Sequence, residues 1–307
     1  MTAHHRWTLD TLLEAYHHHQ RRTRGLREQT LHGYERLVRP LIGAALGEDP
    51  IDPTRLSPSD VIEFVASMRG RFSPRSMKAV RTALRSFLRF LRSEGLCDER
   101  LEAATPTIAH WRLSALPRCL SDGQLDRLLA SFDTSTPCVH RDRAIVLCLA
   151  SLGLRPREVA DLRLEDIDWR RGKIQLRRRK THRGAVLPLP LEAGRALVAY
   201  LRTERPTTDE RCVFVQHLGS RRGQPISSKV VSAAVVRALR RAEIEAPLAG
   251  AYVLRHTVAS RMVRHGASLK EVADFLGHRC LDSTAIYAKL DLPALREVAL
   301  PWPEGIR

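Results

Sequence analysis

Apolar residues recur every three or four positions along most of the chain, a spacing that predicts a mainly helical protein. In the first hundred residues this spacing predicts helices at 9–19, 30–46, 57–68 and 73–95. Ser57 is a plausible N-cap, and Ser73 followed by Pro74 is typical of a helix start. The pattern therefore predicts a helical N-terminal domain at residues 5–105.

The periodicity becomes unclear at residues 101–117, where Pro106 and Pro117 interrupt the chain, and we interpret 106–117 as a linker. Beyond it, helices are expected at 123–132, 140–152, 190–202, 228–242, 254–265, 269–276 and 283–290. Two short strands are expected at 174–178 and 184–189, joined by a basic turn. The fold class is therefore mainly α, with a second domain at 118–307 that combines helices with a small antiparallel sheet.

The chain carries 51 lysines and arginines against 34 acidic residues, a formal net charge of +17. A polyanion is the expected partner, and because both halves of the chain are basic, both are expected to contact it. Aromatic residues make up only 5%, which argues against base stacking as the main binding device. No signal pattern or long apolar run is visible, so we expect a cytoplasmic protein without a membrane partner.

Metal and disulfide chemistry find little support in the sequence. The six cysteines are scattered, without a CxxC pair, which is typical of reduced thiols in the cytosol. Three consecutive histidines at 17–19 lack a second group of metal ligands, so we interpret them as a solvated helix end. We therefore expect no metal and no cofactor.

One face of the predicted helix at 73–95 is basic. The residues expected to contact DNA from it are Arg75, Lys78, Arg81 and Arg85. A solvated face without a partner is the alternative interpretation. The charge of the whole chain favours DNA contact, mostly through phosphates.

The C-terminal third contains residues suited to phosphodiester chemistry. Residues 253–266 read VLRHTVASRMVRHG, Ser268 to Glu271 form a capping box, and residues 276–278 read LGH. Tyr287 follows His278 by nine residues, on a last short helix. Phosphodiester exchange without a metal needs a nucleophile, fixed positive charge at the phosphate and an acid for the leaving oxygen. Tyrosine, arginine and lysine can supply these three functions.

These motifs resemble a known family. The sequence Leu254-Arg255-His256-Thr257, followed by Leu276-Gly277-His278 and Tyr287, resembles the C-terminal signature of the tyrosine recombinase (phage integrase) family. Residues 153–158, GLRPRE, match its GLRxxE segment, and Lys180 lies eight residues before Pro188, like its β-hairpin lysine. The motifs follow the family's order and spacing. The likeness covers essentially the whole chain, including a SAM-like core-binding domain at the N-terminus.

The resemblance implies a role for each matched residue. Arg155 and Arg255 would hold the scissile phosphate, and His278 would donate a hydrogen bond to it. Lys180 would protonate the leaving 5′-oxygen, unless the register shifts this role to the neighbouring arginine. Tyr287 would attack, which gives a 3′-phosphotyrosyl link that needs neither metal nor ATP.

The chain departs from the family at one position. The family's HxxR block is here Tyr252-Val253-Leu254-Arg255, so a tyrosine occupies the histidine position. His256 follows the arginine and does not match that histidine. A phenol with a pKa of about 10 mainly hydrogen-bonds near neutral pH, whereas an imidazole can accept a proton. The residue that deprotonates Tyr287 is therefore unassigned, and Glu158 is expected to orient the site's groups.

The resemblance also implies an assembly on duplex DNA. A homotetramer, or a tetramer with related recombinases, would join two duplexes, with residues 291–298 passed between neighbours or packed within one chain. An Xer-like or mobile-element recombinase is expected, acting in dimer resolution, integration or transposition. The alternatives are a type IB topoisomerase and a non-catalytic helix-turn-helix protein that uses residues 268–278 and 282–290.

Overall fold

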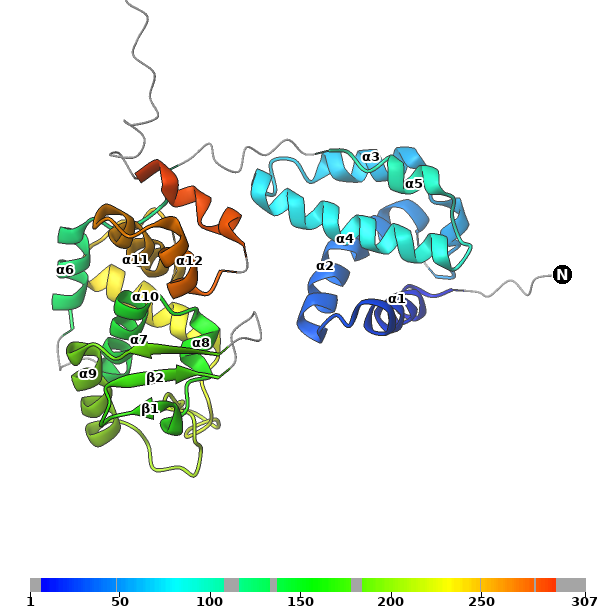
Figure 1. The fold of residues 1–307 in the computed structure, drawn as a ribbon. Coiled ribbons are helices and arrows are strands. Elements are labelled where there is room, and N and C mark those ends of the chain that lie inside the picture. Colours follow the sequence, from blue (N-terminus) through cyan, green and yellow to red (C-terminus); the bar gives the residue numbers. More distant parts are fainter. Residues whose placement is uncertain are drawn as a thin grey trace, which may run out of the picture. The chain divides into compact units, whose positions relative to one another are not determined.

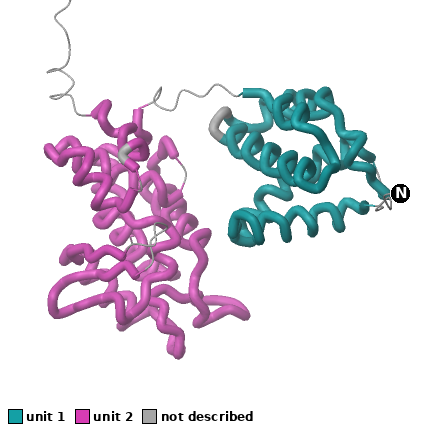
Figure 2. Tube along the Cα trace, turned by 45° about the vertical axis from the view of Figure 1, so that its right-hand side comes forward, with its two compact units in different colours: residues 1–111 teal, residues 112–307 magenta. Residues whose placement is uncertain are grey.

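The computed structural model describes residues 7–290 except 48, 108–115, 133–136, 178–183, 249 and 279, together with the backbone alone at 74, 75 and 281. The chain divides into two compact units, residues 1–111 and 112–307 (Figure 2). The division falls within the segment at 106–117. Each unit has its own apolar core, so each is described separately.

The N-terminal unit is entirely helical in its described part (Figure 1). Its elements are α1 (Leu9–Arg24), α2 (Glu28–Leu46), the 3₁₀ helix η1 (Pro53–Arg55), α3 (Pro58–Ser67), α4 (Pro74–Ser93) and α5 (Glu99–Ala103). Ser57 caps α3 through a reciprocal pair of hydrogen bonds with Asp60, and Ser73 caps α4. The apolar face of α4 lies in the core, so its basic face is left on the outside.

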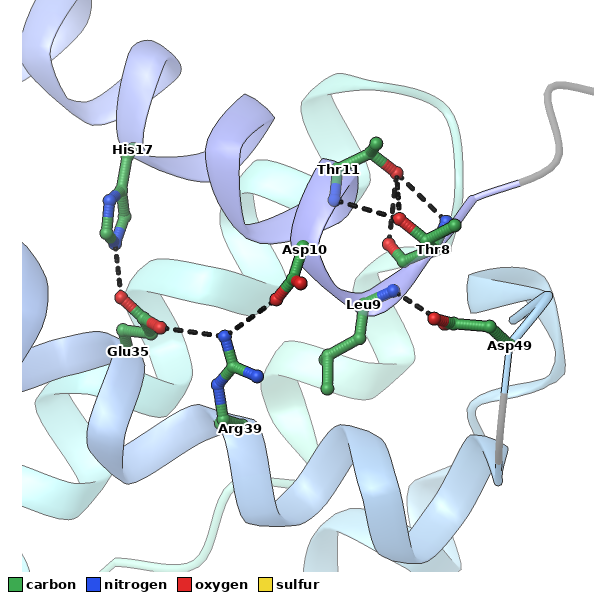
Figure 3. Close-up of polar contacts among 8 residues, drawn as sticks. All are labelled: Thr8, Leu9, Asp10, Thr11, His17, Glu35, Arg39 and Asp49. Carbon is green, nitrogen blue, oxygen red and sulfur yellow. Dashed lines mark hydrogen bonds and ion pairs between the residues drawn. The ribbon is translucent and has the colours of Figure 1, made fainter.

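A short polar chain ties α1 to α2 (Figure 3). Arg39 donates to Asp10 at 2.9 Å and to Glu35 at 3.0 Å, and Glu35 also lies 3.5 Å from the His17 ring. Burial lowers the pKa of His17 below its usual value, with Glu35 opposing the shift. His17 is therefore engaged in helix packing, and not exposed at a solvated helix end as the sequence suggested.

The second unit contains the remaining helices and the sheet. Its helices are α6 (Asp122–Ala130), α7 (Val139–Leu152), α8 (Pro156–Ala160), α9 (Leu191–Thr203), α10 (Ser228–Arg241), α11 (Tyr252–Arg264) and α12 (Leu269–Leu276), with 3₁₀ helices η2 (Leu164–Asp166), η3 (Leu281–Ser283) and η4 (Ala285–Leu290). Helix α7 is the central element and contacts α6, α8, α9, α10 and α11 (Figure 1). Nearly all of its residues are buried, which explains why its sequence lacks a polar face.

The sheet has three antiparallel strands in the order β1 (Ile167–Asp168), β2 (Lys173–Leu176) and β3 (Ala185–Pro188). Ile174 pairs with Leu187, and both side chains are buried. Their neighbours on each strand are exposed, so one face of the sheet packs on the core and the other meets solvent. The mainly α fold class with a small antiparallel sheet is confirmed.

Two predicted helices need correction, and several short elements were missed. The expected helix at 283–290 is a pair of 3₁₀ segments, in which the Tyr287 amide donates to the Thr284 carbonyl three residues back. The first helix continues to Arg24, where Gly25 in the left-handed conformation ends it. Helices α5 and α8 and strand β1 were missed, because two to five residues are too short to show a periodicity.

Candidate active site

Arg255 lies in the first turn of α11, and its buried guanidinium is held by two main-chain carbonyls. One terminal nitrogen donates to the Gly153 carbonyl at 2.6 Å, just after α7, and the other donates to the Leu276 carbonyl at 2.7 Å, at the end of α12. The guanidinium therefore bridges the C-terminal ends of two helices. Carbonyl oxygens at a helix C-terminus carry partial negative charge, which stabilises a cation there.

Arg155 is brought to the same place from the start of α8. It donates to the Gly277 carbonyl at 3.0 Å, next to the carbonyl that Arg255 uses. Glu158 accepts from the Arg155 side chain at 2.7 Å and from the Arg155 amide at 2.8 Å. The carboxylate thus fixes both the side chain and the main chain of Arg155, which agrees with the orienting role expected for Glu158.

Gly153 allows these elements to approach. Its φ is +58°, and a Cβ at this position would lie 2.7 Å from Cδ2 of Leu276. Glycine is the residue that adopts this backbone conformation at little cost, and here it is also the one that leaves room for α12. The GLR and LGH motifs are therefore in direct contact, although more than 100 residues separate them.

His278 follows the last turn of α12, which Gly277 closes with a φ of +63°. The His278 amide donates to the Ala273 carbonyl at 2.8 Å, which fixes the start of the following segment. The ring Nδ1 lies 2.7 Å from Oγ1 of the buried Thr284. This contact connects His278 to the 3₁₀ segment that carries Tyr287.

Tyr287 is buried, with a relative exposure of 2%, in a small apolar cluster. The other core members of this cluster are Ala259, Val263, Val272 and Leu276. Burial raises the pKa of Tyr287 to about 12, because an anion is poorly solvated there; the positive charge of Arg255 opposes the shift. The nucleophile predicted from the sequence therefore lies within the electrostatic reach of a predicted phosphate ligand.

His256 is a site residue that the sequence analysis set aside. Its Nδ1 lies 2.7 Å from the Tyr287 hydroxyl oxygen, and the two ring centroids are 5.8 Å apart. Successive helix residues point about 100° apart, so Arg255 faces the ends of α7 and α12 while His256 faces η4. Tyr252, at the family's histidine position, is 51% exposed. In the sequence, only the position of His256 directly after Arg255 pointed to the site. Nothing near His256 indicated that it would contact Tyr287, 31 residues away.

Several predicted residues cannot be placed in the site. Lys180, the basic turn around it and residues 291–298 lie outside the described residues, and so does the side chain of Arg75. In the N-terminal unit Lys78 is exposed, Arg81 is half-buried, and Arg85 donates to Glu102 at 3.0 Å. Glu102 also accepts from Arg89 at 2.7 Å. Part of the basic face on α4 is therefore paired with a carboxylate from α5.

The described residues show neither a metal-binding cluster nor a membrane-spanning helix. They contain no group of three or more histidine, cysteine or acidic side chains placed to hold a metal ion. None of the helices among them is both long and apolar enough to cross a bilayer.

The second segment of the proposed helix-turn-helix is also unsuited to reading DNA. Between α12 and residue 290, the described chain forms short 3₁₀ turns, and Tyr287 in the second of them is buried against α11. A recognition helix needs an exposed α-helical face for the major groove. The geometry therefore disfavours the helix-turn-helix interpretation.

Comparison with known protein families identifies the family to which the chain belongs. Residues 118–292 match the model of the phage integrase family, and residues 13–95 match that of the phage integrase N-terminal SAM-like domain. The chain belongs to the phage integrase family. Its members are tyrosine recombinases, enzymes that exchange DNA strands.

Sequence relatives extend over both units. The chain is 42% identical over 291 residues to y4rA of Sinorhizobium fredii, named an integrase/recombinase, and the match covers 95% of this chain and 70% of that one. It is 30% identical over 300 residues to tyrosine recombinase XerD of Listeria monocytogenes, covering 94% of this chain and 97% of the relative. The similarity is therefore not confined to the C-terminal motifs.

Solved structures share the fold. The XerH recombinase bound to its difH substrate has a TM-score of 0.71 and 19% identity, with 97% of this chain and 85% of that chain covered. The lambda integrase dimer bound to a core site has a TM-score of 0.68 and 20% identity, with 98% and 100% covered.

Proposed function

We propose that this protein is a site-specific DNA recombinase that cuts and rejoins strands through a 3′-phosphotyrosyl link at Tyr287. The observation that carries the proposal is the pair of guanidiniums of Arg155 and Arg255, held by adjacent carbonyls at the end of α12. A pair of fixed cations suits the two non-bridging oxygens of a phosphodiester, because arginine keeps its charge and donates in a fork.

The remaining catalytic roles follow from the same chemistry. His278 donates a hydrogen bond to the phosphate, and its contact with Thr284 orients the ring. Tyr287 attacks phosphorus, and Lys180 protonates the leaving 5′-oxygen. A 5′-hydroxyl from the partner strand then reverses the step, so the bond energy is conserved and neither metal nor ATP is consumed.

DNA binding is shared between the two domains in this proposal. Residues 5–105 form the core-binding domain, 106–117 the linker and 118–307 the catalytic domain. The basic face of α4, with Arg75, Lys78, Arg81 and Arg85, contacts phosphates. The active form on DNA is a tetramer that joins two duplexes, with residues 291–298 exchanged between neighbours. One supporting comparison is lambda integrase, which has been solved as a tetramer on a Holliday junction.

The decisive experiment traps the covalent intermediate. A library of nicked duplexes with randomised inverted arms is incubated with the protein in EDTA, and the complexes that survive denaturant are sequenced. Cleavage near the nick releases a short fragment that carries the 5′-hydroxyl. Because this fragment diffuses away, the strand cannot be rejoined and the phosphotyrosyl link accumulates. We expect a covalent band that recovers a defined inverted-repeat sequence.

The matched control is Tyr287→Phe, which keeps the buried ring but removes the nucleophile. We expect this variant to bind the recovered duplex as tightly as the wild type and to give no covalent band. A wild-type protein that binds one sequence without a covalent band would overturn the proposal in favour of a DNA-binding regulator. A covalent band that forms without EDTA and is lost when EDTA is added would contradict the metal-free mechanism.

A further inference from the structure

The hydroxyl of Tyr287 needs a proton acceptor, and the expected position for one holds Tyr252. Tyr252 is half-exposed and is itself a phenol, a poor base near neutral pH. His256 lies one residue beyond Arg255, with its Nδ1 2.7 Å from the Tyr287 oxygen. We propose that His256 is the catalytic base of this chain, the residue that takes the proton from Tyr287 as it attacks. This inference rests on the proposed recombinase function.

The residues on either side of His256 in the sequence hold its backbone in place. On one side Arg255 is held by two carbonyls, at 2.6 and 2.7 Å. On the other side the buried Thr257 donates to the Val253 carbonyl at 2.8 Å and accepts from the Leu120 amide at 2.9 Å. The backbone of His256 therefore lies between two anchored residues. A base on such a backbone needs little reorganisation before proton transfer.

The environment of Tyr287 explains why an acceptor is required. Burial raises the pKa of the phenol to about 12, so near neutral pH the free hydroxyl is almost entirely protonated. Arg255 stabilises the phenolate but has no lone pair to receive the proton. With its own proton on Nε2, the His256 ring presents the Nδ1 lone pair to the hydroxyl, which donates to it.

The proton on the Tyr287 hydroxyl moves to Nδ1 of His256 while the oxygen forms a bond to phosphorus. The bond between phosphorus and the 5′-oxygen breaks, and that oxygen takes a proton from Lys180. In the ligation step a 5′-hydroxyl attacks, its proton returns to Lys180, and the His256 imidazolium returns its proton to the departing phenolate.

The test compares His256→Asn with the wild type on the duplex recovered by covalent trapping. An asparagine amide can occupy the position of Nδ1 and still hydrogen-bond to the hydroxyl, but it cannot accept a proton at neutral pH. We expect the rate of covalent complex formation to fall by about 10²–10³-fold, the range of general base catalysis. DNA affinity and the melting temperature should stay near the wild-type values. The matched control is His265→Asn, an exposed histidine at the end of the same helix, whose rate should not change.

A second substrate separates the base from the acid. With sulfur in place of the bridging 5′-oxygen, the leaving group departs without protonation. We expect this substrate to restore cleavage by Lys180→Ala and to leave His256→Asn slow. In His256→Ala, added imidazole should restore part of the rate, because it can occupy the vacated space and accept the proton. This rescue is also readable if the alanine variant is less stable.

Two outcomes would overturn the inference. A His256→Asn variant that forms the covalent complex at the wild-type rate or faster would show that the histidine only holds the resting tyrosine. Recovery of His256→Asn on the sulfur substrate would instead place His256 on the leaving-group side. Failure of the proposed function is distinguishable from both, because the wild type itself would then form no covalent complex.

Discussion

The two halves of the candidate site are built in different ways. On the phosphate side, Arg155 and Arg255 are fixed by main-chain carbonyls at the ends of two α-helices. On the nucleophile side, Tyr287 lies in a short 3₁₀ segment that is connected to the rest of the site through side chains, His278 to Thr284 and His256 to Tyr287. Short 3₁₀ turns have poorer hydrogen-bond geometry than α-helices, so this half has the weaker local support.

This difference indicates which half is organised before DNA binds. Two like charges held close together repel each other, and the cost is met during folding by helix carbonyls and by Glu158. Tyr287, the proposed nucleophile, is a buried phenol whose raised pKa keeps it neutral near neutral pH, and in the proposed reaction it acquires charge only as it attacks. Substitutions on the phosphate side should therefore slow the reaction by displacing the arginine guanidiniums. Substitutions on the nucleophile side should slow it by displacing the Tyr287 ring.

The largest effect is expected from Arg255→Lys. Lysine keeps the positive charge but cannot bridge the Gly153 and Leu276 carbonyls with a planar fork. We expect covalent complex formation on the trapped duplex to fall by about 10²–10³-fold. Single-turnover kinetics measures the rate of covalent complex formation, and unfolding by urea checks that the variant is as stable as the wild type. A rate within a few-fold of wild type would show that charge alone suffices on the phosphate side.

Gly153→Ala should disturb the contact between α7 and α12. The added methyl would meet Leu276 at 2.7 Å, at a φ of +58°. We expect a loss of about 2–4 kcal/mol in the free energy of unfolding, from left-handed strain together with overpacking. Gly172→Ala is a matched control, because its φ is also +58° but no atom lies within 4 Å of the added Cβ. Equal losses in the two variants, measured by urea denaturation, would contradict a packing role for Gly153.

Thr284→Val tests the nucleophile side. Valine preserves the buried shape but removes the hydroxyl that lies 2.7 Å from His278. We expect about tenfold slower covalent complex formation, the size of one lost hydrogen bond at about 1.4 kcal/mol. Thr284→Ser, which keeps the hydroxyl, should react at nearly the wild-type rate. If both variants slowed equally, packing rather than orientation of His278 would be responsible.

Glu158→Gln should have a smaller effect on the phosphate side. The amide can still accept one hydrogen bond from Arg155, but the charge that balances the guanidinium is lost. We expect covalent complex formation to slow about three- to tenfold, equivalent to about 1 kcal/mol. Single-turnover kinetics at saturating DNA measures this change. Glu165→Gln, in an exposed ion pair of the same unit, should leave the rate unchanged.

The smallest effect is expected in the N-terminal unit, from Glu102→Gln. This change releases Arg85 and Arg89, which now donate to the carboxylate at 3.0 and 2.7 Å. If α4 binds phosphates, DNA affinity should rise about two- to fivefold and depend more steeply on salt, because freed cations displace counterions. Titrations at several salt concentrations measure this. An affinity that stays the same or falls would indicate that Glu102 supports the fold of the binding face.

Local signals allowed much of the fold to be predicted. The helix starts at Ser57, Ser73 and Ser268 were predicted because a cap and the residues after it lie together in the sequence. Their apolar spacing then indicated which face would be buried. The short elements, such as α5 and α8, depend on tertiary contacts and were not predicted.

The site could be predicted only in part. Arg155, Arg255, His278 and Tyr287 were selected by their resemblance to the family's motifs. Nothing in their spacing indicated that both arginines would donate to neighbouring carbonyls of one helix end. The contact between His256 and Tyr287 was also hidden, because it depends on how the 3₁₀ segment folds back onto α11.

The end of α12 has a mechanical consequence. Its last two carbonyls receive Arg255 and Arg155, and the residue that follows them is His278. A shift of this helix end would therefore disturb the hydrogen bonds of both arginines and the position of His278 at the same time. The three side chains proposed to bind the phosphate therefore share one support, the C-terminal end of α12.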